Sequence, residues 1–137
     1  MEHRNERRQR LAPSARALMV TDALALVAFV LAGAASHRDS GVLVVIGRNL
    51  VPLGAAWMAA TVLVGTYRRR SWGSMVLTWA IAAPVGILVR SWAVGSPRGS
   101  ELGTFLLVGS GFSLLFLSVG RALVAGATRA RAGEQPA

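Results

Sequence analysis

Long apolar runs separated by short polar segments dominate the pattern of this 137-residue chain. A helix that crosses a bilayer needs about 20 mainly apolar residues. Four runs of that length predict transmembrane helices over residues 17–35, 46–66, 72–92 and 102–125. The segments between them are rich in glycine, proline, serine and arginine, which favour turns and loops. The pattern therefore predicts an all-α fold, an integral membrane bundle of four transmembrane helices.

The same pattern divides the chain into three parts. Residues 1–16 form a basic N-terminal segment, 17–126 the four-helix transmembrane domain and 127–137 a polar tail. An alternative interpretation makes residues 1–35 a cleaved signal peptide, because a basic start precedes an apolar run that ends in small residues. That run is longer than the roughly 7–15 apolar residues of a signal peptide, and it contains Asp22. An uncleaved first helix is the simpler interpretation.

The amino-acid composition points to the membrane and excludes several chemistries. Hydrophobic residues make up 53% of the chain and charged residues only 15%, which is too apolar for an ordinary soluble domain of this length. The chain has no cysteine, so disulfides, thiolate catalysis and cysteine-ligated metals are excluded. We expect a multi-pass protein of the cell membrane, with the lipid bilayer as its first partner.

All 15 basic residues are arginines, and their distribution predicts how the chain crosses the membrane. Cytoplasmic loops carry an excess of basic residues. Eleven arginines lie in the N-terminal segment, between the second and third helices and near the C-terminal end, whereas four lie toward the opposite side. We therefore expect both termini in the cytoplasm. The excess of nine positive charges favours anionic lipids at the cytoplasmic face as partners over nucleic acid, for which no recognition module is present.

An aspartate stands near the start of the first apolar run. A carboxylate in lipid is costly, so Asp22 is expected to face other helices and to have a cationic partner. The fourth predicted helix returns toward the cytoplasm and places Arg121 at a similar depth, within reach of its long side chain. We predict an intramembrane ion pair between Asp22 and Arg121.

The opposite side of the membrane has its own polar residues. His37 ends the first helix, Arg48 begins the second and Arg90 closes the third. One interpretation is a mouth that handles anions or protons, because histidine titrates near physiological pH and arginines attract negative groups. In the other, which we favour, the arginines extend to lipid headgroups, Asp39 and Glu101 offset them, and His37 is an ordinary loop residue. The candidate intramembrane polar site comprises Asp22, His37, Arg48, Arg90 and Arg121.

Small and aromatic residues are expected to pack the helices together. Lipid tails solvate leucine as well as a neighbouring helix does, so association in membranes depends on small residues that let backbones approach. Gly33 shares a face of the first helix with Asp22, and Gly86 lies within the third. Trp57 and Trp79 lie deeper than the interfacial positions that tryptophan prefers, so we expect both to be packing residues.

The sequence contains no motif for catalysis or cofactor binding. It has only two histidines, of which His3 lies in the basic N-terminal segment, so neither a bis-histidine haem site nor a zinc motif is predicted. There is no glycine-rich phosphate loop and no Gly-x-Ser-x-Gly element. Ser36 and His37 are adjacent, but Asp39 is the only carboxylate nearby in the sequence that would orient them. We expect no metal, no cofactor and no enzyme activity.

Several positions together carry a resemblance to a known family. Asp22 stands early in the first helix, Gly33-x-x-x-His37 ends it, Pro52 and Trp57 lie in the second helix, and Arg90 closes the third. This pattern resembles the small prokaryotic membrane proteins of the domain of unknown function 3054 family, over most of the chain from Ala17 to about Ala125. The family pattern has an aromatic residue after the proline, whereas Leu53 stands here. The resemblance implies a four-helix membrane protein and no particular activity.

Two classes of function stay open. In the first, the protein is a scaffold or accessory membrane subunit in which the pair of Asp22 and Arg121 fixes the register of the helices. In the second, it is a small transporter or channel for protons or anions, oligomeric because four short helices enclose little space. We favour the first. Assembly as a homo-oligomer or in a larger membrane complex is compatible with either.

Overall fold

The computed structural model describes residues 12–35 and 42–133, and these are almost entirely helical. The helices are α2 (Ala15–Ala35), α3 (Val42–Val64), α4 (Thr66–Arg69), α5 (Trp72–Val94) and α6 (Ser100–Gly133). All but α4 are long and apolar enough to cross a bilayer. No strand occurs within the described residues. The predicted all-α fold with four long apolar helices is confirmed, and α4 is an additional short helix between the second and third.

Tight caps separate the helices around α4. Gly65 lies between α3 and α4 with a φ of 70°, in the left-handed region that glycine adopts without strain. After Arg70, the hydroxyl of Ser71 accepts a hydrogen bond from the backbone N–H of Ser74 at 3.1 Å and so caps the start of α5. Gly95, with a φ of 76°, ends α5. The chain therefore reverses from α3 into α5 without a long loop.

The last helix is longer than the apolar pattern predicts. α6 runs from Ser100 to Gly133, whereas the prediction ends the helix at residue 125 and makes residues 127–137 a polar tail. The extra residues include alanine and arginine, which favour helices. The hydroxyl of Thr128 donates to the carbonyl of Val124 at 2.8 Å, so this polar side chain is accommodated within the helix. Hydrophobic periodicity marks where a helix meets lipid and does not mark where the helix stops.

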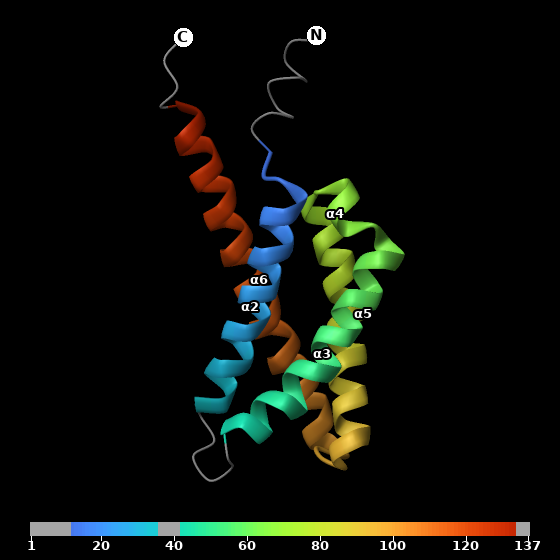
Figure 1. Cartoon of the computed structure of the whole chain (residues 1–137). Helices are drawn as coiled ribbons and strands as arrows, with labels where there is room; N and C mark the ends of the chain where they lie inside the picture. Colours follow the sequence, from blue (N-terminus) through green and yellow to red (C-terminus); the bar gives the residue numbers. More distant parts are fainter. Residues whose placement is uncertain (1–11, 36–41, 134–137) are drawn as a thin grey trace.

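Contacts between neighbouring helices join the four long helices, seen from the side in Figure 1, into a closed ring. α3 packs most extensively against α5, and α2 packs against α6. Smaller contacts between α2 and α3 and between α5 and α6 close the ring, while no close backbone contact joins α2 to α5 or α3 to α6 in the described part of the chain. Helix α4 lies at the same end as the start of α2 and the end of α6. We call this the α4 end, and the other the opposite end.

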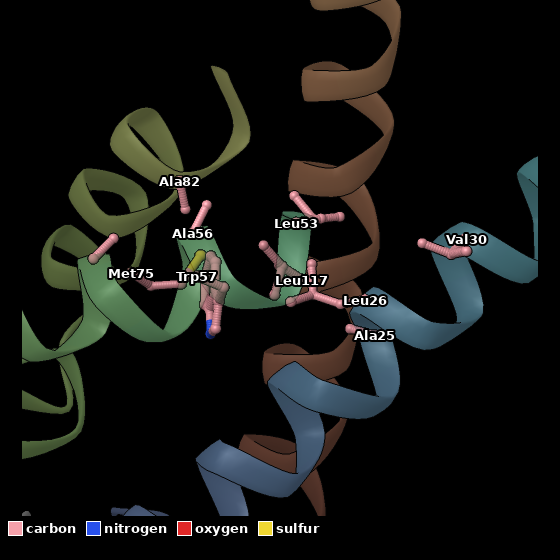
Figure 2. Packing of buried hydrophobic residues seen from close by; sticks show 10 residues of the cluster. Ala25, Leu26, Val30, Leu53, Ala56, Trp57, Met75, Ala82 and Leu117 are labelled. Carbon is pink, nitrogen blue, oxygen red and sulfur yellow. The ribbon is translucent and has the colours of Figure 1, made fainter. Parts of the chain in front are cut away.

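Buried side chains from all four long helices meet near the middle of the ring (Figure 2). Met75, Ala82 and Leu117 are fully inaccessible. Gly86 of α5 lies against Leu53 of α3 so closely that a Cβ atom at Gly86 would stand 2.9 Å from the Leu53 Cα. Gly86 thus allows a close approach of α5 to α3, as expected for a small residue that packs helices together. The core cluster consists of Ala25, Leu26, Val30, Leu53, Ala56, Trp57, Ala60, Met75, Ala82 and Leu117.

The outer surface of the ring is strongly apolar. Large hydrophobic side chains are exposed on every long helix, including Leu24, Leu43, Val62, Leu63, Trp92, Leu107 and Leu123. A water-soluble protein rarely exposes so large a continuous apolar surface, whereas lipid tails solvate such side chains without cost. The surface is therefore suited to the interior of a bilayer.

Candidate functional site

Asp22 and Arg121 form a buried ion pair at the α4 end. Nε of Arg121 donates to Oδ1 of Asp22 at 2.9 Å, and Nη2 donates to Oδ2 at 2.6 Å. The exposed fractions of the two residues are 0% for Asp22 and 4% for Arg121. Two parallel charge-assisted hydrogen bonds are the strongest arrangement available to an arginine and a carboxylate. The structure thus brings together the two residues whose pairing the helix geometry predicts.

The packing of α2 against α6 explains how the two side chains meet. Gly120 precedes Arg121, and a Cβ atom at this glycine would stand 3.0 Å from Cγ2 of Thr21. Thr21 in turn precedes Asp22. The absence of a side chain at Gly120 therefore lets the two helices approach beside the ion pair, so that neither charged side chain has to reach far.

Further polar groups from the α3–α5 connection surround the pair. The backbone carbonyl of Ser71 accepts a hydrogen bond from Nη1 of Arg121 at 3.4 Å. Burial raises the pKa of Tyr67 to about 12, and the charge of Asp22 acts in the same direction. The phenol therefore stays protonated and uncharged near neutral pH. Its oxygen accepts a hydrogen bond from Nε1 of Trp57 at 3.0 Å. Trp57 thus packs in the core, as predicted, and is also anchored to Tyr67.

Hydroxyl groups complete this end of the ring. Thr66 and Thr78 are both fully buried, and their hydroxyls are hydrogen-bonded to each other. The hydroxyl of Thr78 also donates a hydrogen bond to the backbone carbonyl of Ser74 at 2.8 Å. Within the described residues, every buried side-chain nitrogen or oxygen has a hydrogen-bond partner. The α4 end is therefore a closed polar network around the ion pair.

The opposite end of the ring contains a cavity of about 460 Å³. All four long helices line it, and neither Asp22 nor Arg121 does. All four phenylalanines of the chain contribute to its wall: Phe29, Phe105, Phe112 and Phe116. The rings of Phe29 and Phe116 pack edge to face, with centroids 6.2 Å apart. A smaller space, bordered by Leu53 and Gly86, continues inward from the cavity toward the core.

Arg90 is held in a fixed position on the cavity wall. Its Nε donates to Oδ1 of Asn49 at 2.6 Å, and its Nη1 donates to the backbone carbonyl of Ser96 at 3.0 Å. The guanidinium carbon lies 4.7 Å from the centre of the Phe105 ring, in cation–π geometry. None of these partners carries a negative charge. Arg90 is therefore well oriented while its charge is not neutralised by any of them.

Arg48 also lines the cavity and is exposed. Within the residues that the structure describes, it makes no hydrogen bond and no ion pair. The positive charge of Arg48 repels the positive charge of Arg90. Two positive groups thus border one cavity, and Asn49, next to Arg48 on α3, is the polar side chain that joins α3 to Arg90.

The other predicted residues have different outcomes. Trp79 packs against the core, as expected, and its Nε1 donates to Ser113 and to the carbonyl of Ser110 on α6. Gly33 is exposed on the cavity wall, and a Cβ atom there would have no neighbour within 4 Å. The close helix approach predicted at Gly33 is not found, because α2 at this height borders open space. His37 lies outside the described residues.

Several residues of both sites are not among the predicted ones. Asn49 and Phe105 hold Arg90, and Tyr67 and Gly120 lie beside the ion pair. Asn49 could have been identified from the sequence, because an amide in an apolar run needs a hydrogen-bond partner. The others are ordinary residue types whose roles depend on how the helices are rotated. No group of three or more histidine, cysteine or acidic residues that could hold a metal ion occurs in the described ranges.

Comparison with known proteins identifies the family and gives no relative of known activity. No curated protein and no solved structure matches the chain. A family model described as "Protein of unknown function (DUF3054)" matches residues 19–124, which include both members of the ion pair and the whole cavity wall. This match confirms the resemblance that Asp22, Pro52, Trp57 and Arg90 carry. Because it covers well over half of the 137 residues, the chain belongs to the DUF3054 family.

Proposed function

We propose that this protein is a multi-pass protein of the cell membrane with both termini in the cytoplasm, and that it serves as a scaffold or accessory subunit. The α4 end carries Arg68, Arg69 and Arg70, and α2, which the arginine-rich N-terminal segment precedes in the sequence, begins at this end. Basic residues concentrate in cytoplasmic loops, which supports this orientation. The same arginines favour contact with anionic lipids of the cytoplasmic leaflet.

The observation that carries the proposal is the closed geometry of Asp22. Both of its oxygens are bonded to Arg121, and the residue is inaccessible. A carboxylate that carries protons through a membrane needs contact with water on at least one side. Asp22 instead has the geometry of a clasp between α2 and α6. Buried pairs of this kind contribute to a specific helix arrangement without any transport.

A transporter or channel for protons or anions is the second candidate, and one observation favours it. The cavity at the opposite end places two arginines beside an open volume among all four helices. Transport proteins use such charges to admit ions of the opposite sign. In this case the path would continue past Leu53 and Gly86, where α3 and α5 are in contact.

A pair of variants separates the two candidates. Asp22→Asn leaves the guanidinium of Arg121 buried without a counter-ion, which is expected to cost about 3–5 kcal/mol of folding free energy. Asp22→Asn combined with Arg121→Gln removes both charges and is expected to recover most of that loss. The measurement is the yield of monodisperse protein and its resistance to denaturation. Glu101→Gln, at an exposed carboxylate of α6, is the control and should leave both unchanged.

The recovered double variant then allows a flux assay in liposomes. The scaffold proposal predicts no proton or anion flux from wild type, and none from the double variant. A pH-dependent flux in wild type that disappears in the well-folded double variant would overturn the proposal in favour of transport through Asp22. If Asp22→Asn were as stable as wild type, the clasp itself would be refuted.

A further inference from the structure

Among the described residues, the charged groups that line the cavity at the opposite end are all positive. Two other described charged residues, Arg98 after α5 and Glu101 in the first turn of α6, lie near this end and do not line the cavity. Their formal charges sum to zero and leave those of Arg48 and Arg90. Within the described ranges, no acidic side chain lines the cavity. Positive charge beside apolar walls is costly unless an anion accompanies it.

Arg90 has a donor available for such an anion. Its Nε and Nη1 are engaged by Asn49 and Ser96, and Phe105 supports the plane of the guanidinium. Nη2 donates no hydrogen bond to any described residue. The three existing contacts fix the orientation of the group before a ligand arrives, which lowers the entropy cost of binding. Arg48 brings a second guanidinium, whose donors bond to none of the described residues.

The walls of the cavity specify the rest of the ligand. Apart from Arg48, Asn49 and Arg90, the described lining residues are apolar side chains, glycine and alanine. A small inorganic anion would leave the phenylalanine rings without contact. A volume of about 460 Å³ falls within the range of roughly 300–1,000 Å³ that is typical of small-molecule sites. An acyl chain or a comparable hydrocarbon is the complement of such a wall.

We propose that this cavity binds an amphiphilic anion, with a carboxylate or phosphate group between Arg48 and Nη2 of Arg90 and a hydrocarbon part among the phenylalanines. Guanidinium groups suit both headgroups, because they form paired hydrogen bonds with either. The ligand is a free fatty carboxylate or the headgroup and chain of an anionic lipid, which share this chemistry. The proposal requires neither the scaffold role nor transport, since it concerns binding alone.

Thermal unfolding of the full-length protein in an uncharged detergent tests the proposal. The probes are dodecanoate, dodecanol of the same chain length without charge, acetate without a chain, and phosphatidylglycerol beside phosphatidylcholine. A ligand that binds only the folded state raises the unfolding midpoint, and the rise increases with ligand concentration. We expect a rise with dodecanoate, with phosphatidylglycerol or with both, and none with dodecanol, acetate or phosphatidylcholine. A response to dodecanoate alone identifies a free carboxylate, and one to phosphatidylglycerol alone identifies a lipid.

Two matched pairs of variants locate the site. Gly33→Leu adds a side chain to open space on the cavity wall, and Gly111→Leu adds the same side chain to open space on α6 away from the cavity. Arg48→Gln removes a cavity charge, and Arg98→Gln removes an exposed charge near the same end that does not line the cavity. Gly33→Leu and Arg48→Gln should each weaken binding by about tenfold or more, since hydrogen bonds to charged groups and filled sites have effects of this size. The two controls should bind as wild type does.

Several outcomes would overturn the inference. An equal midpoint rise with dodecanol would show that charge is not recognised, and an equal rise with acetate would show that the apolar wall is not used. Binding that survives in both Gly33→Leu and Arg48→Gln would place the ligand elsewhere. A Cβ atom at either glycine would have no neighbour within 4 Å, and Arg48 makes no hydrogen bond or ion pair with a described residue, so these variants are expected to fold. The clasp variants at Asp22 and Arg121 leave the cavity wall intact, so failure of one proposal does not affect the test of the other.

Discussion

Arg121 and Arg90 meet the cost of a charge among apolar helices in different ways. Arg121 has a carboxylate partner and is almost completely buried. Arg90 is half-buried. It donates hydrogen bonds to an amide oxygen and a backbone carbonyl and lies over an aromatic ring. The first arrangement neutralises the charge and fixes two helices. The second orients the charge without neutralising it, which is the property of a group that receives a ligand.

Tyr67 gives a pH-dependent signal for the closed network. Burial raises its pKa from 10.0 to about 12, so the phenolate is disfavoured in the folded protein. The stability that follows from this shift is fully present below about pH 10 and is lost as the pH rises through about 12. Tyr67 is the only tyrosine in the chain. We therefore expect the ultraviolet absorbance of tyrosinate to appear near pH 12 in the folded protein and near pH 10 after denaturation. Titration of Tyr67 near pH 10 in the folded protein would contradict the burial of its phenol. The Tyr67→Phe variant, which has no tyrosine, gives the background absorbance.

The sequence allowed one of these residue-level features to be predicted with its partner. Asp22 lies near the start of the first apolar run and Arg121 near the end of the last, so opposite helix directions place them at one depth. The partner of Arg90 was not predictable in this way. Asn49 meets it across the interface between α3 and α5, about one helical turn from the close contact of Gly86 with Leu53, and this pairing of helix faces cannot be read from either helix alone.

At the scale of the elements, glycine positions decide which helices touch. The number of long helices and their apolar centres follow from the sequence pattern. Their partners follow from small residues such as Gly86 and Gly120, where a side chain would meet the neighbouring helix. Gly33 is likewise a glycine within an apolar run, but a Cβ atom there would have no neighbour within 4 Å. A glycine in an apolar run therefore does not reveal by itself whether it packs or lines a cavity.

Gly86→Ala tests the contact between α3 and α5. The new Cβ would stand 2.9 Å from the backbone Cα of Leu53, so the helices have to separate. Overpacking of this kind is expected to lower the free energy of unfolding by about 1–3 kcal/mol. Gly54→Ala on α3 is the matched control, because its Cβ would have no neighbour within 4 Å, and alanine favours a helix over glycine by about 1 kcal/mol. Unfolding in a denaturing detergent should show opposite signs for the two variants; equal effects would place the contact elsewhere.

At the scale of the whole molecule, the two ends of the ring differ in kind. One end is closed by an ion pair and hydroxyl groups, and the other is open and lined by aromatic rings. The core cluster takes side chains from all four long helices (Figure 2). The apolar pattern predicts a bundle of four helices but not this difference, because the cavity is lined by residues of all four long helices and not by any single run of residues.

Labelling of introduced cysteines tests the proposed orientation, and the native chain has none to interfere. Ser100 and Ala130 are exposed, uncharged positions near opposite ends of α6. We expect a membrane-impermeant maleimide to label Ser100→Cys in intact cells and to label Ala130→Cys only after permeabilisation. The reverse pattern would invert the topology. Labelling of both positions from one side would be incompatible with a membrane-spanning α6.

The length of α6 has a mechanical consequence. Its 34 residues extend roughly 50 Å at about 1.5 Å per residue, whereas the hydrocarbon layer is about 30 Å thick. In Figure 1 the helix projects well past α4. An upright α6 would therefore stand as a stalk, with Arg129 and Arg131 at headgroup level or in the aqueous phase beyond. Arg121 lies where the projecting part of α6 begins, and it is bonded to Asp22 of α2. A force applied to the projecting part would therefore act first on the two hydrogen bonds between Arg121 and Asp22.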